Sequence, residues 1–193
     1  MINVELALLA RALGATWRAL WPRVRRLKEP SDTGRALSDD EVRRLIVAAD
    51  ELAAGKAVLR VKRNGAIHEQ RLGPRGVLLP ALIRMALHTG MRLSELLGLK
   101  WRHVSLTSGV IEIPGTKTQA ARRVVPISEP LRTVIEEHQA WYRRRFGAAA
   151  PDWYLFPSGS PQPADPERPC TTVKHAWETV RKIAGVECRF HDL

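Results

Sequence analysis

Cysteine is scarce in this sequence of 193 residues, in which Cys170 and Cys188 are the only two and form no CxxC pair. No two histidines stand at the spacing of metal ligands either. A disulfide framework and a zinc site are therefore not indicated, and a reducing compartment, the cytoplasm, is expected.

Long apolar runs are absent as well. The N-terminus begins with apolar residues, but Glu5, Arg11 and Arg18 interrupt them well before the roughly 20 residues that a membrane span requires. We therefore expect no targeting segment, no transmembrane helix and no membrane partner.

Acidic residues are the minority, with 20 Asp and Glu against 31 Lys and Arg, a net charge of +11 and a pI near 10.6. Such a field attracts polyanions, and nucleic acid is the commonest, because each neutralised phosphate releases counterions. An anionic membrane, an acidic protein or a merely basic soluble surface are the alternatives. The acidic clusters at 39–41 and 136–137 fit a helix cap and a solvated helix face. They do not fit the separated carboxylates of a two-metal nuclease, so no metal is expected.

The chain has room for one full domain and a tail. Apolar residues at helical spacing mark a helix over 1–21 that Pro22 ends, and residues 22–37 are rich in Pro, Gly and Arg. We interpret them as a basic linker, lying beside DNA or simply solvated. Ser38 and Glu41 form the pattern of a helix capping box, and a compact domain is predicted over 38–193.

Helical and strand patterns alternate within this domain. Asn64-Gly65 predicts a solvent-exposed hairpin over 58–72 that pairs Arg60 with Glu69. The fold class expected is α+β, a mainly helical domain with a small antiparallel sheet of about three strands. The remaining predictions are helices after Ser38 and over 79–90, 93–97, 131–146 and 172–184, and strands at 103–106, 110–113 and 123–127.

Arg92 stands just after a glycine break, at the start of a short predicted helix. A guanidinium can bind phosphate oxygens through two hydrogen bonds. Glu95, three residues on, lies on the same helical face and could hold the arginine. On these grounds alone, a surface Arg–Glu pair is a more frequent arrangement than a phosphate clamp.

Several motifs resemble the tyrosine recombinases of the phage integrase family, and they occur in that family's order. The segment TGMRLSELLGLKW at 89–101 is similar to the family's first conserved box, and Arg92 matches its arginine. Lys117 falls between two predicted strands, as the catalytic lysine does in the family. Leu155-Phe156-Pro157 resembles the family's LFP stretch, and His191-Asp192-Leu193 the start of its H-x-x-R box. Residues 1–21 resemble the last helix of the domain that grips DNA.

The resemblance implies site-specific breakage and rejoining of double-stranded DNA through a phosphotyrosine, which stores the bond energy and needs neither metal nor other cofactor. It also implies self-assembly on DNA and no small-molecule substrate. Integration, excision and resolution share one active site and are not distinguished. The implied catalytic roles are phosphate binding for Arg92, general acid catalysis for Lys117 and assistance by His191, with Glu95 in support; the candidate DNA contacts are Lys100, Arg102, Arg122 and Arg123.

Two family residues have no match in the 193 residues: the second arginine and the tyrosine nucleophile. Only Tyr142 and Tyr154 are present, both precede His191, and we interpret both as packing residues. We therefore expect a piece of the catalytic domain that binds DNA without cleaving it. The rival interpretation is a non-catalytic DNA-binding or interaction module on the same scaffold. A basic RNA-binding protein is disfavoured, because no aromatic-glycine pattern occurs.

Overall fold

The computed structural model of the chain describes residues 11–12, 34–114, 123–159 and 162–193. The chain divides into two compact units, Met1–Thr33 and Gly34–Leu193. Most of the predicted first helix and linker, and also Lys117 and Arg122, lie outside the described residues.

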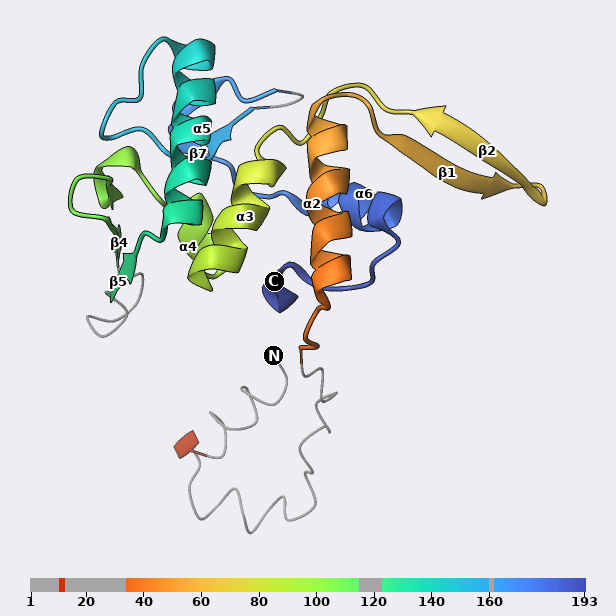
Figure 1. Cartoon of the computed structure of the whole chain (residues 1–193), viewed down its shortest axis with the longest axis horizontal. Coiled ribbons are helices and arrows are strands. Elements are labelled where there is room, and N and C mark those ends of the chain that lie inside the picture. The colour runs from red at the N-terminus through yellow and green to blue at the C-terminus, as the bar shows by residue number, and fades with distance from the viewer. Residues whose placement is uncertain (1–10, 13–33, 115–122, 160–161) are drawn as a thin grey trace. The chain divides into compact units, whose positions relative to one another are not determined.

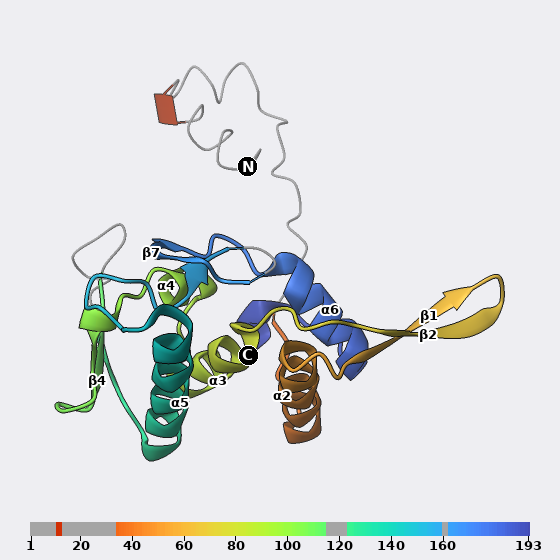
Figure 2. The same cartoon turned by 90° about the horizontal axis from the view of Figure 1, so that it is seen from above.

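Five helices and three small antiparallel sheets can be followed in the described part of the second unit (Figures 1 and 2). Helix α3 contacts both α2 and α5, and α6 packs against α2. The predicted α+β class is confirmed. The helices are α2 (Asp39–Ala53), α3 (Leu79–Thr89), α4 (Leu93–Leu97), α5 (Glu129–Phe146) and α6 (Lys174–Ala184), with 3-10 turns η1 (Trp101–His103) and η3 (Phe190–Asp192).

The ends of α2 and α3 follow from local sequence. Ser38 accepts a hydrogen bond from the Glu41 amide while the Glu41 side chain accepts from the Ser38 amide, so the predicted capping box is confirmed. Gly90 takes the left-handed conformation, with φ at 61°, and ends α3. Because glycine adopts this conformation without a steric penalty, α4 can begin almost at once, with Arg92 at its N-cap.

The predicted sheet of three strands is present, in the order β3 (Val104–Ser105), β4 (Val110–Ile113) and β5 (Arg123–Pro126). Ile111 and Ile113 of β4 are buried and fix the sheet to the core. Ile113 pairs with Arg123 at the end of the ladder. The sheet thus holds both ends of the 115–122 connection, which carries Lys117.

One of the three sheets was not predicted. No strand was predicted within residues 147–170, but β6 (Pro157–Ser158) and β7 (Asp165–Pro169) pair there, with Pro157 opposite Pro169. Proline has no amide hydrogen for a sheet ladder and is confined to edges and bulges. A proline-rich segment therefore does not look like a strand, although a pair with two free edges tolerates it.

Aromatic residues fill the core beside α5. His138 is buried, its Nε2 lies 2.7 Å from the Leu155 carbonyl oxygen, and burial lowers its pKa to about 4. It is therefore neutral near pH 7 and donates to that carbonyl. Tyr142 is fully buried, and its hydroxyl donates to the Tyr154 carbonyl at 2.8 Å. The interpretation of Tyr142 as a packing residue is confirmed.

No helix in the described ranges is both long enough and apolar enough to cross a membrane.

The burial pattern of α2 predicts the effect of two neighbouring truncations. Leu45 is fully buried, whereas Val47 is 48% exposed. We expect Leu45→Ala to lower the free energy of unfolding by about 2–5 kcal/mol, through lost burial and the cavity left behind. Val47→Ala should change it by less than about 0.5 kcal/mol. Urea denaturation measures both variants, and equal losses would show that α2 is not packed as described.

Candidate functional site

Arg92 is held at the start of α4 by Glu95. The Arg92 amide donates to Glu95 Oε2 at 2.9 Å, and Arg92 Nη1 lies 3.2 Å from Glu95 Oε1. The Glu95 side chain is 10% exposed, while that of Arg92 is 72% exposed. The predicted pairing of these residues is therefore confirmed, and it leaves most of the guanidinium open to solvent.

Arg123 makes the closer contact with Glu95. Its Nη1 and Nη2 donate to the two carboxylate oxygens of Glu95 at 3.0 and 2.8 Å. This paired geometry links β5 to α4 and places two arginines around one carboxylate. The hydrogen bonds from Arg123, and then those from Arg92, lower the pKa of Glu95 to about 2. Sequence reasoning missed this contact, since nothing in the local pattern joins residues 28 positions apart.

His191 lies on η3, which is fixed on both sides. Phe190 packs edge-on against Trp177 of α6, with ring centroids 5.3 Å apart. The Asp192 side chain, 5% exposed, accepts from the Arg189 amide at 2.7 Å. The guanidinium and amide of Arg189 hold the pKa of Asp192 below its usual value. His191 itself is exposed.

Arg92 and His191 line the same cavity, which has a volume of about 370 Å³. Met91 and Phe190 form its apolar side, and no acidic side chain lines it. A liquid water molecule takes up roughly 30 Å³, so a tetrahedral anion such as a phosphate diester has ample room. The structure thus brings together two of the three catalytic candidates around a cationic hollow.

Lys117 and Arg122 lie outside the described residues, and their roles stay predictions. The strands that flank them are described. Arg123 follows directly, and its side chain reaches Glu95 beside Arg92. The base of the connection that carries Lys117 is therefore linked to Arg92 through Glu95.

The side chains of Lys100 and Arg102 form contacts away from the cavity of Arg92. Lys100 Nζ lies 4.9 Å from the centre of the Tyr154 ring, and Arg102 forms an ion pair with Asp152. Arg102 lines a separate cavity of about 160 Å³. The structure does not bring these residues to the cavity of Arg92, and their contact with DNA stays a prediction.

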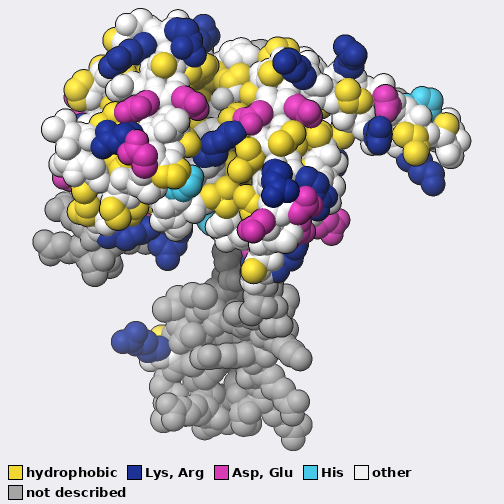
Figure 3. All heavy atoms as spheres, viewed as in Figure 1, with side chains coloured by type: hydrophobic (Ala, Val, Ile, Leu, Met, Phe, Trp, Pro, Cys, Tyr) yellow, Lys and Arg dark blue, Asp and Glu magenta, His cyan; other side chains and the backbone are white. Residues whose placement is uncertain are grey.

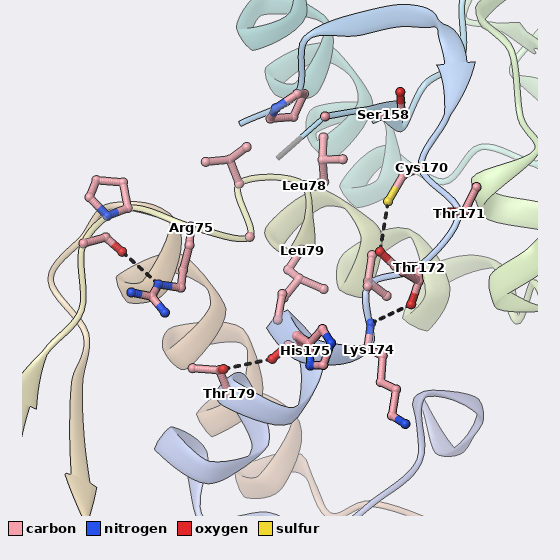
Figure 4. A pocket seen from close by; sticks show the side chains of 18 residues that line it. Arg75, Leu78, Leu79, Ser158, Cys170, Thr171, Thr172, Lys174, His175 and Thr179 are labelled. Atoms are coloured by element: carbon pink, nitrogen blue, oxygen red, sulfur yellow. Dashed lines mark hydrogen bonds between the residues drawn. The ribbon is translucent and has the colours of Figure 1, made fainter. Parts of the chain in front are cut away.

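A larger cavity, about 760 Å³, lies elsewhere, between the 73–79 segment and the start of α6 (Figure 4). Arg75, Lys174 and His175 contribute to its wall with several hydroxyl groups, and no acidic side chain does. Sequence analysis did not single it out, because its cationic residues come from distant segments. Across the described ranges, no cluster of three or more His, Cys, Asp or Glu could hold a metal ion.

The sequence and the fold of the chain both match those of known proteins. The sequence model of the phage integrase family matches residues 35–193, and the chain belongs to that family. The resemblance found in the motifs is therefore confirmed.

The chain is similar in sequence to two characterised relatives and in structure to one solved protein. It is 33% identical over 81 residues to the shufflon-specific DNA recombinase of Escherichia coli, covering 40% of this chain and 21% of the relative. It is 38% identical over 76 residues to tyrosine recombinase XerC of Pseudomonas entomophila strain L48, covering 39% and 24%. The crystal structure of XerA recombinase shares the fold, with a TM-score of 0.53 and 22% identity over 97% of this chain and 57% of that one. The matches thus span only a part of each of these proteins.

The lowered pKa of Glu95 generates a prediction about stability. A depressed pKa means that ionised Glu95 stabilises the fold fully above pH 4.5, and that this contribution is lost as pH falls toward 2. We expect Glu95→Gln to lower the free energy of unfolding above that window by about 1–3 kcal/mol. The difference from the unsubstituted protein should shrink within the window. Urea denaturation at a series of pH values measures it.

Glu41 provides a matched control, because hydrogen bonds from Arg35 and Ser38 lower its pKa to about 2 as well. Glu41→Gln should show a similar pH dependence without disturbing Arg92 or Arg123. A pH-independent effect of Glu95→Gln would contradict the ion pairs described for this carboxylate.

Proposed function

We propose that this chain is the greater part of the catalytic domain of a site-specific DNA recombinase, whose whole protein breaks and rejoins duplex DNA through a phosphotyrosine. One observation carries the proposal: Arg92 and His191, from distant segments, line one cationic cavity. Family membership supports it. Integration, excision and resolution would all use this same geometry.

Each residue has a chemical task in the proposed reaction. A tyrosine oxygen attacks the phosphorus, a P–O bond forms, and the bond to the 5′-oxygen breaks. Charge grows on the non-bridging oxygens, which Arg92 would bind with its free N–H groups. Lys117 would protonate the departing 5′-oxygen, and His191 would assist the proton transfer or hold the phosphate. Rejoining reverses these steps. No water is consumed, and no metal ion is required.

Glu95 and Arg123 would act on Arg92 without touching the substrate. Since the Arg123 guanidinium occupies both Glu95 oxygens, Arg92 keeps only one side-chain contact at 3.2 Å. A guanidinium has five N–H donors, so several stay available for phosphate oxygens. Glu95 thus orients Arg92, but its single negative charge is shared between two arginines and does not neutralise both.

Neither tyrosine of the chain suits the nucleophile's role. Burial raises the pKa of Tyr142 to about 12, and its hydroxyl is bonded to a backbone carbonyl. Tyr154 lies under Lys100. We therefore propose that the 193 residues bind duplex DNA without forming a covalent link to it.

The partner proposed is double-stranded DNA, with self-assembly of the whole protein on DNA, no small-molecule substrate and a cytoplasmic location. The alternative function is a non-catalytic DNA-binding or interaction module. It would not require the Arg92 cavity to bind a phosphate, and this difference can be measured.

Binding to DNA should depend on Arg92 more than on an arginine outside the cavity. We expect Arg92→Gln to weaken binding to a labelled random-sequence duplex and to reduce the slope of log K against log salt by about 1, the loss of one phosphate contact. Arg143→Gln, which removes an exposed arginine in the last turn of α5, should change both quantities less. Fluorescence anisotropy over a salt series measures them.

Equal effects of the two substitutions would argue for a diffuse basic surface and against the cavity. A protein–DNA complex that survives SDS would overturn the proposal that these residues bind without a covalent link.

A further inference from the structure

A hairpin projects from the body of the second unit (Figures 1 and 2), and its partly buried Leu59 packs against the core near the root. We call it the arm; it consists of β1 (Val58–Arg63), the Asn64-Gly65 turn and β2 (Ala66–Arg71). Ala57 and Leu72 are buried at its root. Every residue of β2 is exposed, and Ile67 is 70% exposed. The core therefore anchors the arm only where it joins the body.

The shape of the arm is nevertheless well specified. Asn64 and Gly65 both have positive φ, 49° and 79°, as a tight type I′ hairpin turn requires. The ladder pairs Arg60 with Glu69, and Arg60 Nε lies 3.0 Å from Glu69 Oε1. The predicted exposed hairpin and its register are confirmed. A two-stranded hairpin is marginally stable alone in water, so an exposed and regular one suggests a surface that something contacts.

The register gathers positive charge on one face of the arm. Directly opposed residues point to the same side, and Val58 opposes Arg71, Arg60 opposes Glu69, and Lys62 opposes Ile67. Arg60, Lys62 and Arg71 therefore share a face. Glu69 is the only acidic residue of the arm and forms an ion pair with Arg60. Within the described ranges, Lys62 and Arg71 have no ion pair, and Figure 3 shows basic side chains spread along the arm.

Further basic residues line a cavity that the segment after the arm helps to form. The chain returns from the arm through the 73–79 loop, which forms one wall of the cavity of about 760 Å³. Figure 4 shows Arg75 on this wall and His175 and Lys174 at the start of α6 across from it. No acidic side chain lines the cavity. Arg75 and Lys174 thus add positive charge on the body, in and beyond the loop that follows the arm.

We propose that the arm is an accessory DNA-binding element, a β-ribbon that enters the major groove away from the Arg92 cavity. This inference rests on the proposed function. A six-residue strand is about 20 Å long, and the major groove, roughly 12 Å wide, admits a two-stranded ribbon. Lys62 and Arg71 contact phosphates and position the ribbon, while the exposed Ile67 near the tip reaches the base edges.

Charge favours DNA over a second copy of the chain as the occupant. The chain carries +11, and the arm adds four Lys or Arg to one Glu, so two arms repel each other. A polyanion gains from the same field through released counterions.

The test compares two double substitutions that remove the same charge. Lys62→Gln/Arg71→Gln neutralises the free cations of the arm, and Arg143→Gln/Arg144→Gln neutralises two exposed arginines in the last turn of α5. We expect the arm variant to reduce the slope of log K against log salt by about 2, which shrinks the loss of affinity between about 50 and 200 mM salt roughly tenfold. The α5 variant should leave the slope close to that of the unsubstituted chain. Anisotropy with a random-sequence duplex measures binding, and acetylation of Lys62 should slow when DNA is bound.

The outcomes separate the two proposals. If the unsubstituted chain does not bind duplex DNA, the proposed function fails and the arm inference with it. If it binds and Arg92→Gln weakens binding, but the arm variant equals the α5 variant, the arm inference alone is overturned. Loss of self-association in light scattering with unchanged DNA affinity would make the arm a protein contact and would also overturn it. Thermal melting checks that both variants fold.

Discussion

The site depends on one carboxylate that three groups share. Glu95 accepts from the Arg92 amide, the Arg92 guanidinium and both terminal nitrogens of Arg123. The first contact fixes the start of α4, and the last ties β5 to it. The same side chain therefore sets the backbone of Arg92 and the base of the connection that carries Lys117. Because Glu95 is only 10% exposed, little water competes for these bonds, and its pKa near 2 keeps it ionised in ordinary conditions.

This arrangement meets two opposing requirements on Arg92: a fixed orientation of its guanidinium, and N–H donors that remain free. An arginine bonded to both oxygens of a carboxylate is well placed, but few of its donors remain free. Here Arg123 takes that paired geometry and is 39% exposed, whereas Arg92 makes a single side-chain contact and is 72% exposed. Arg123 thus neutralises most of the charge of Glu95, and the positive charge of Arg92 faces the cavity.

Interactions that are close in sequence could be predicted, and those that join distant segments could not. The Ser38 cap, the Asn64-Gly65 turn and the Arg92–Glu95 pair each depend on residues a few positions apart, and all three are present. The Arg123–Glu95 contact joins residues 28 positions apart, and no local rule indicates it. The β6–β7 pair is close in sequence, but its prolines are not typical of a strand. The convergence of Arg92 and His191 was expected only through the family resemblance. For the residues outside the described ranges, Lys117 and Arg122, the sequence remains the only guide.

The relation between Arg92 and His191 is set by the core and not by a direct contact. Gly90 ends α3 and so fixes where Arg92 begins α4. Phe190 rests on Trp177 of α6, α6 packs on α2, and α2 packs on α3. A change anywhere along this series moves the histidine relative to the arginine. The buried residues of α2, α3 and α6 therefore set the separation of Arg92 and His191 as well as the stability of the fold.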